Sequence, residues 1–293
     1  MVVRTWLLLL AALLAGGSGP MPQEAAPLSI WAERMYPTYE NPLHSEITVN
    51  GTLVNIFTSD AVETLPPLKT GWNTLVMKTT VQEPTQNTNG LTFRIGPGRK
   101  DPQKGAIVMN PVLWQFRNET DWRHKGSAYS HPLGPSVKEV TVTYNLYYAG
   151  LDREAGELKA GDYVLRGKGT YPTFSSPVVG TVFVNGTPLN TFTSAPRDVI
   201  ITSLLKPGRN EIRIVSGRVP NIIATNDIEF SVSGPAEWEV SNNRYTLAPI
   251  AQFKAMQGWQ RNPKTGQLVN PLKAEADTIE RVIPFMMKPP AEK

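Results

Sequence analysis

The feature that most constrains the fold of this chain is an internal repeat. Residues 36–59 align without a gap with residues 171–194 at a constant offset of 135, and 12 of the 24 positions are identical. Within this block, Val49-Asn50-Gly51-Thr52 recurs as Val184-Asn185-Gly186-Thr187. A period this long indicates two copies of one domain, because the units of solenoid repeats have roughly 20–50 residues.

The correspondence continues beyond this block after a two-residue adjustment. At an offset of 137, Gln115-Phe116 matches Gln252-Phe253, and Trp122 matches Trp259. The total length of 293 residues also agrees with two domains, each large enough to bury its own core. We predict a first domain at 27–147, a linker at 148–159, a second domain at 160–286 and a tail at 287–293.

The hydrophobic pattern inside each copy has a period of two, which is typical of half-buried strands. Leu91, Phe93 and Ile95, for example, alternate with polar residues. Asn50-Gly51 and Asn185-Gly186 stand between strand-like runs and predict tight hairpin turns, because both residue types accept positive φ. The predicted fold class is all-β, with two tandem jelly-roll-like β-sandwich domains.

The N-terminal segment has the pattern of a secretory signal peptide over residues 1–17. Arg4 precedes the apolar run Trp6 to Leu14, and Ala15-Gly16-Gly17 has the small residues of a cleavage site. The run is shorter than the roughly 20 residues of a spanning helix, and an uncleaved anchor is the alternative. We expect an exported protein, periplasmic or extracellular, with no integral membrane span after cleavage.

Composition narrows the set of partners and cofactors. The chain has 29 Lys and Arg against 25 Asp and Glu and no dense basic run, which argues against nucleic acid as a partner. It has no cysteine and three histidines, so a thiolate metal site is excluded and no metal ligands are expected. No cofactor is expected, with a structural calcium ion near Asn226-Asp227 as a weakly supported alternative.

A turn and strand pattern shared by both copies resembles a known family. It consists of Val49-Asn50-Gly51, then Phe57, then Leu68-Lys69-x-Gly71-x-Asn73, and it recurs in the second copy around Val184-Asn185-Gly186 and Leu205 to Asn210. It resembles galactose-binding-like jelly-roll domains. Family 2 glycosidases contain such a domain as a non-catalytic sandwich, and related domains bind glycans or protein partners. The resemblance therefore implies a binding module.

Two short motifs could suggest catalysis, and each has a simpler interpretation. Ser203 and Lys206 have the spacing of a serine–lysine pair, but that chemistry requires a helix and a Pro-Gly pair follows the lysine. Glu119 and Asp121 lie beside Trp122, and a polar loop over a packed tryptophan explains them more simply than a glycosidase pair. We expect no catalytic residues and no enzyme.

Tryptophans present in only one copy are the candidate ligand contacts. Trp122 and Trp259 are equivalent and are attributed to packing. A shared fold does not require the unmatched rings, and large aromatic rings stack on sugars or anchor protein interfaces. The candidates, with the first two preferred, are Trp72, Trp114, Trp31 and Trp238.

The preferred function is an exported, non-catalytic glycan-binding module. The alternative is an accessory or structural subunit that docks onto a cell-envelope protein assembly. Glycan binding predicts exposed aromatic rings in a groove or on a flat sheet face, whereas docking predicts a large apolar patch at one end of the molecule.

Overall fold

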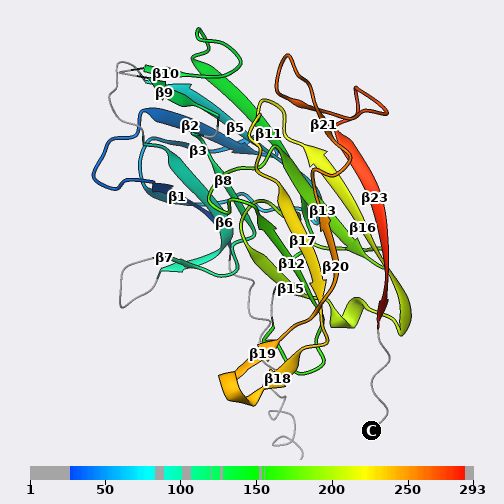
Figure 1. Cartoon of the computed structure of the whole chain (residues 1–293). Coiled ribbons are helices and arrows are strands. Elements are labelled where there is room, and N and C mark those ends of the chain that lie inside the picture. Colours follow the sequence, from blue (N-terminus) through cyan, green and yellow to red (C-terminus); the bar gives the residue numbers. More distant parts are fainter. Residues whose placement is uncertain are drawn as a thin grey trace, which may run out of the picture.

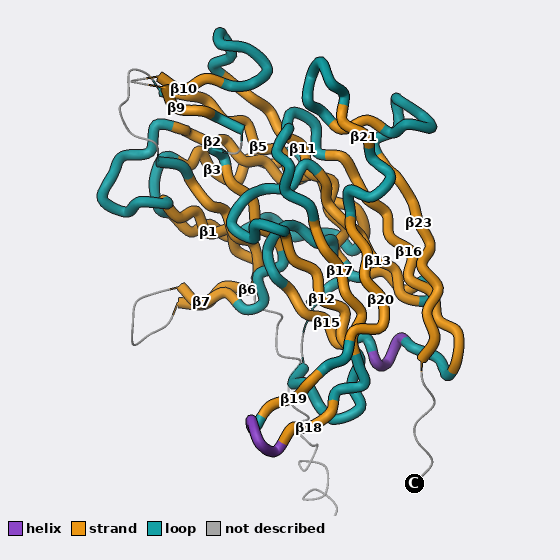
Figure 2. The backbone as a smooth tube through the Cα atoms, in the orientation of Figure 1, coloured by secondary structure: helices purple, strands orange, loops and turns teal. Residues whose placement is uncertain are grey.

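The computed structural model describes residues 27–82, 89–100, 107–119, 121–125, 128–151, 154 and 156–287 (Figure 1). The predicted signal peptide and nearly all of the predicted tail lie outside these residues. Strands and loops make up the described chain, apart from the short 3-10 helices η1 (Thr202–Leu204) and η2 (Val240–Asn242) (Figure 2). The prediction of an all-β fold is therefore confirmed.

The N-terminal half, residues 28–148, contains two main antiparallel sheets. One has the order β4-β1-β6, with β8 also paired to β6, and the other has the order β11-β5-β2-β3. The strands are β1 (Leu28–Arg34), β2 (Leu43–Val49), β3 (Thr52–Phe57), β4 (Ala61–Thr64), β5 (Gly71–Val81), β6 (Leu91–Lys100), β7 (Ile107–Met109), β8 (Trp114–Arg117), β9 (Arg123–Lys125), β10 (Ala128–Ser130) and β11 (Glu139–Tyr148).

The C-terminal half, residues 164–287, also contains two main sheets, with the orders β15-β12-β17-β20 and β14-β13-β16-β23. The strands are β12 (Val164–Gly169), β13 (Val178–Val184), β14 (Thr187–Pro188), β15 (Arg197–Ile200), β16 (Gly208–Arg218), β17 (Ile228–Ser233), β18 (Glu237–Glu239), β19 (Arg244–Thr246), β20 (Pro249–Lys254), β21 (Gln260–Arg261), β22 (Leu268–Val269) and β23 (Thr278–Met287).

The main strands of the two halves follow the same order. The sheet edge β6-β8 corresponds to β17-β20, and the hairpin β2-β3 corresponds to β13-β14. Both hairpins turn through an Asn-Gly pair with positive φ, at 50° and 81° for Asn50 and Gly51 and at 47° and 85° for Asn185 and Gly186. The predicted tight turns are thus confirmed at both sites.

Each half buries its core between its two main sheets. Inward-facing side chains alternate along the strands, as in β2, where every second residue from Leu43 to Val49 is buried. Phe57 meets Phe93 edge to face at 5.4 Å in the first half, and Phe192 meets Phe230 at 5.3 Å in the second. This arrangement of two facing sheets is sandwich-like.

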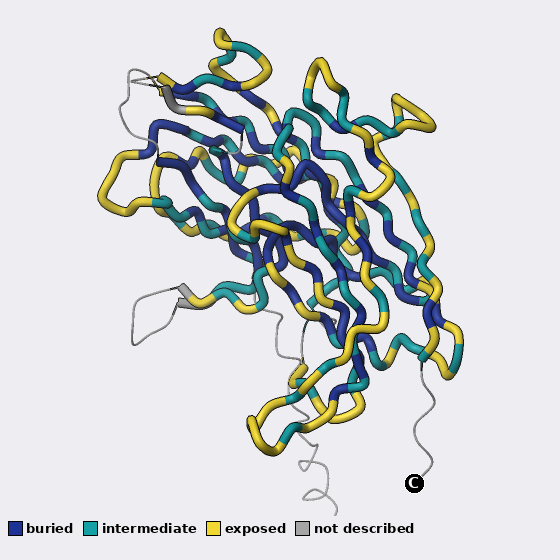
Figure 3. The backbone as a smooth tube through the Cα atoms, viewed as in Figure 1, coloured by how far each residue is buried: buried dark blue, intermediate teal, exposed yellow. Residues whose placement is uncertain are grey.

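The two halves pack against each other at a contact surface that we call the junction. Strand β8 lies at the edge of its sheet, yet all four of its residues are buried (Figure 3). Its outward amides are satisfied by hydroxyls of the other half: Gln115 N donates to Thr193 Oγ1 at 2.9 Å, and Arg117 N donates to Ser175 Oγ at 2.8 Å. The junction therefore covers a sheet edge that would otherwise be open.

The segment between the halves contributes to this packing. In the segment predicted as a linker, 148–159, the side chain of Glu154 is buried and pairs with Arg197 at 3.5 Å. Ala149 N also donates to Asn190 Oδ1 at 2.6 Å. Glu157 and Lys159 near its end are exposed, so the segment is packed against the second half in one part and solvated in another.

The Gly208→Val substitution should destabilise the second half by about 1–3 kcal/mol. Gly208 has φ of 83°, and a Cβ there would meet nothing within 4 Å, so the cost comes from backbone strain rather than from a clash. Urea unfolding measures the change. Gly208→Asn is the matched control and should cost less, because asparagine tolerates this region. Equal midpoints for wild type and Gly208→Val would contradict the interpretation.

Candidate binding pocket at the junction

A cavity of about 260 Å³ lies at the junction, and we call it the junction pocket. It is formed by the loop after β8 and by two loops of the C-terminal half. Its main lining residues are Glu119, Asp121, Trp122, Tyr171, Phe174 and Asn226. The pocket therefore requires both halves.

Asp121 lines this pocket in a strained conformation. Its φ is 71°, an uncommon value for a residue with a side chain. The side chain is buried, and Oδ2 accepts a hydrogen bond from Ile223 N at 2.5 Å. Within the described part of the chain, Oδ1 has no hydrogen-bond partner. A buried carboxylate oxygen without a partner is costly, so a ligand donor at this position would stabilise it.

The electrostatics of the pocket follow from burial. Burial raises the pKa of the Asp121 carboxyl, and the hydrogen bond from Ile223 and the charges of Arg123 and Arg261 oppose the shift. Burial also raises the pKa of Glu119, whose carboxylate pairs with Arg117 at 2.7 Å. Glu119 thus has a cationic partner, whereas Asp121 keeps one free acceptor.

Two aromatic rings line the open side of the pocket. Tyr171 is 58% exposed and Phe174 is 45% exposed, and their rings meet edge to face at 6.5 Å. Asn226 fixes their loop, because its Nδ2 donates to Tyr171 O and Phe174 O and its Oδ1 accepts from Tyr171 N. Arg117 lies over the Phe174 ring at 4.8 Å and orients it from the other half.

This arrangement suits a ligand with both hydroxyl groups and an apolar face. An exposed ring offers a stacking surface, and Asp121 Oδ1, which is itself shielded from solvent, is an acceptor without a partner that a hydroxyl reaching it would satisfy. Small-ligand sites commonly combine an apolar surface with a few fixed polar groups. Tyr171 and Phe174 were not predicted from the sequence, because the candidates were chosen only among tryptophans present in one copy, and Tyr171 is a tyrosine matched by Tyr36.

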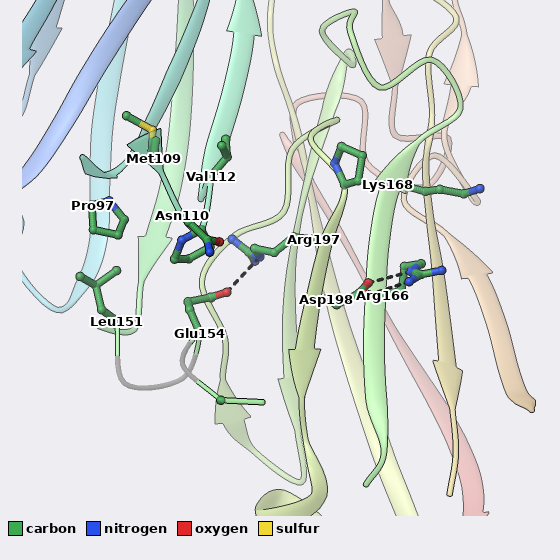
Figure 4. Close-up of a pocket in the computed structure, with 13 residues that line it drawn as sticks. Pro97, Met109, Asn110, Val112, Leu151, Glu154, Arg166, Lys168, Arg197 and Asp198 are labelled. Carbon is green, nitrogen blue, oxygen red and sulfur yellow. Dashed lines mark hydrogen bonds and ion pairs between the residues drawn. The ribbon is translucent and has the colours of Figure 1, made fainter. Parts of the chain in front are cut away.

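A larger cavity of about 890 Å³ also lies between the halves (Figure 4). Four of its charged groups form pairs: Arg166 binds Asp198 through two hydrogen bonds of 2.7 and 2.6 Å, and Arg197 pairs with Glu154. None of the described residues that line it is aromatic. Most of the charged protein groups that could bind a ligand in this cavity are therefore engaged in ion pairs, with Lys168 as the exception, and we favour the junction pocket.

The two preferred tryptophans both lie at the junction. Trp114 is only 2% exposed, and its Nε1 donates to Thr191 O at 3.0 Å, so its prediction as a ligand contact is wrong. The ring is unmatched in the other copy because it anchors one half on the other. Trp72 is 45% exposed, and its ring meets Tyr147 edge to face at 5.4 Å.

The other two tryptophans lie away from the junction pocket. Trp31 lies on β1, and Arg94 covers its ring at 5.3 Å. Trp238 lies on the β18–β19 hairpin, where it is 47% exposed and contacts Tyr245 at 4.9 Å. The structure does not bring the four tryptophans together in one site.

The remaining sequence candidates have structural partners. Trp122 and Trp259 are both buried, as packing predicts. Asp227 Oδ1 accepts amides from Ile228 and Met256 at 2.7 and 2.8 Å, which gives this residue a role in fixing the loop. Across the described residues, His, Asp and Glu side chains nowhere gather in threes suited to a metal ion.

No helix in the described part of the chain has the length and apolar character needed to cross a membrane. Comparison with known protein families, curated proteins and solved structures found no match.

Trp114→Ala should destabilise the protein by about 3–5 kcal/mol, because it removes a buried ring and leaves a cavity at the junction. Thermal unfolding measures the loss. Trp238→Ala is the control, since the exposed ring of Trp238 should contribute little. Trp114 would not be an anchor if the two variants melted at the same temperature.

Proposed function

We propose that this chain is an exported, non-catalytic glycan-binding protein, periplasmic or extracellular, that binds a sugar in the junction pocket. The observation that carries the proposal is the free Oδ1 of buried Asp121 beside the exposed rings of Tyr171 and Phe174. A sugar offers both of the matching groups, a hydroxyl donor and an apolar ring face. The pocket volume suits one sugar residue of a longer chain.

We further propose that the halves are two copies of a galactose-binding-like jelly-roll domain. The repeat in the sequence and the matching strand orders support a duplication. In each half, most links between consecutive main strands cross from one sheet to the other, a property of jelly-roll sandwiches. The family resemblance of the turn motifs points the same way.

The roles of the two carboxylates support binding rather than catalysis. Glu119 forms an ion pair with Arg117, and Asp121 receives the Ile223 amide. Hydrolysis of a glycoside needs one acid free to donate a proton and a second free to attack or activate water. Here one carboxylate is held by a cation, and the other is suited to accept a sugar hydroxyl.

Asp121→Asn should weaken sugar binding by tenfold or more, because the variant replaces the free acceptor with an amide. The fold should persist, since asparagine tolerates positive φ and its Oδ1 can still accept the Ile223 amide. Binding is measured on an array of galactan, β-glucan, arabinoxylan and chitin oligosaccharides and then by calorimetry on the strongest of these. If wild type binds none of them, or the Asp121→Asn protein binds as wild type does, the proposal fails.

The same pair of proteins tests pH dependence. Because burial raises the pKa of Asp121, wild-type binding should fall with decreasing pH at higher pH values than an exposed aspartate would require. The contribution of Asp121 to folding stability changes with pH in the opposite direction to binding. Burial favours the protonated carboxyl, so this contribution is lost as the pH rises through the raised pKa. The Asp121→Asn protein should show neither change.

Tyr171→Ala and Phe174→Ala should each weaken binding to the same oligosaccharide by about tenfold or more, because each removes a stacking surface of the pocket. Trp238→Ala is the control for loss of an exposed ring elsewhere. Comparable losses in all three variants would show that removal of any exposed ring weakens binding nonspecifically. Unchanged binding in Tyr171→Ala and Phe174→Ala would exclude these rings from the site.

A further inference from the structure

The edge strands β8 and β20 hold matching positions but have different surroundings. Gln115 on β8 pairs with Arg94, and Gln252 on β20 pairs with Ser231, all at the offset of 137. All four residues of β8 are buried: Phe116 stacks on Tyr144 in the core of its own half, whereas Gln115 and Arg117 lie against the other half. On β20, Gln252 and Lys254 are exposed. The matching side chains of the second half are thus exposed to solvent, although the Lys254 carbonyl accepts a hydrogen bond from Arg281 of β23.

The segments that cover β8 also have exposed counterparts. Residues 190–194 of the C-terminal half are all buried at the junction, whereas in the matching segment 55–59 only Phe57 is buried. The loop 36–40 is exposed throughout, and its counterpart 171–175 touches β8 through Pro172 and Ser175. The N-terminal half thus carries an unused copy of the covering surface.

Three of the residues that form hydrogen bonds at the junction are retained on the unused surfaces. Gln115 Nε2 donates to Pro172 O at 2.7 Å, and Gln115 N donates to Thr193 Oγ1 at 2.9 Å. Each of the three residues is identical in the other copy, where its counterpart is exposed. These counterparts are Gln252, Pro37 and Thr58.

An apolar contact can form beside these hydrogen bonds. At the junction, Thr191 N donates to Tyr147 O, and Tyr147 N donates to Thr191 Oγ1. Their counterparts by strand register and alignment are Met286 for Tyr147 and Ile56 for Thr191, which are 62% and 54% exposed. Two exposed apolar side chains thus occupy positions that would face each other.

The two unused surfaces also carry opposite charges at matching positions. Arg117 N donates to Ser175 Oγ at the junction, and the corresponding residues are Lys254 and Glu40. Both are exposed. Lys254 Nζ pairs with Glu229 at 2.9 Å within its own sheet, so the Glu40 carboxylate would meet a cation that already has one acidic neighbour.

We propose that copies of this chain associate head to tail, with the β20 edge of one copy binding the 36–40 and 55–59 segments of the next. The contact repeats the junction between the halves. A head-to-tail contact uses different surfaces on its two sides. Each oligomer therefore keeps one free β20 edge at one end and one free surface of segments 36–40 and 55–59 at the other. Association therefore extends to oligomers of more than two copies.

This contact is weaker than the junction. Trp114, the buried anchor of β8, corresponds to Ala251 on β20, so the contact between copies lacks its largest ring. Association should therefore depend on protein concentration, while the junction holds within each chain.

Cysteine cross-linking tests the contact directly, because the chain has no cysteine of its own. Thr58→Cys protein is mixed with Gln252→Cys protein and oxidised under mild conditions. At the junction the backbone nitrogen of Gln115 lies 2.9 Å from Thr193 Oγ1, so the matching residues of two copies would be direct neighbours in the proposed contact. The mixture should give a disulfide-linked heterodimer, and a chain with both substitutions should give a ladder of oligomers.

The matched control replaces Gln252→Cys by Leu272→Cys, a position that is 95% exposed and lies between β22 and β23, outside the proposed contact. Heterodimer should form at least tenfold faster with the Gln252→Cys protein than with the Leu272→Cys protein. Equal rates, or a wild-type chain that sediments as a monomer at every concentration up to its solubility limit, would overturn the proposal.

A gain of function provides the second test. Ala251→Trp restores the anchor at the open edge and should strengthen association at least tenfold in sedimentation equilibrium, with Leu272→Trp as the control for an added exposed ring. Unchanged association in the Ala251→Trp protein would also count against the contact. Both tests are made without oligosaccharide, so their outcome is independent of whether the junction pocket binds sugar.

Discussion

The hydrogen bonds that the C-terminal half makes to the edge of β8 are the interaction on which the rest of this structure depends. Gln115 N and Arg117 N point out of their sheet and would be open to water or to another strand. Hydroxyls of Thr193 and Ser175 satisfy them, and Trp114 fills the space beside them. These contacts cover the sheet edge without adding a strand to it. The sheets of the two halves therefore stay separate, although the halves pack against each other.

The junction pocket results from the same constraint. Covering β8 brings the 171–176 loop of the second half over the loop that follows β8, and Asp121 is fixed there by the Ile223 amide. The strained φ of Asp121 and its free oxygen lie where two loops from different halves meet. Neither half could form this site alone, so the site differs from the features that both halves share.

The repeat made much of the fold predictable, because turn chemistry and alternation are local. Asn50-Gly51 and Asn185-Gly186 adopt the expected positive φ, and Gly208 does so as well. The site was less predictable because its residues depend on how the halves meet. Glu119 and Asp121 were noticed as neighbours, but nothing local shows that Tyr171 would lie across from them. Trp114 was selected for being unmatched, and its burial follows from a contact between halves that periodicity does not encode.

Two similar halves that pack through unlike surfaces leave one partner surface unused at each end, unless the sequence changes to block it. Here the halves differ in the anchor, with Trp114 in one and Ala251 in the other, while the glutamine, proline and threonine of two junction hydrogen bonds are identical. Loss of the ring lowers the affinity of the open edge, whereas the retained polar groups preserve its specificity. The missing anchor thus distinguishes the permanent contact within the chain from the proposed reversible contact between chains.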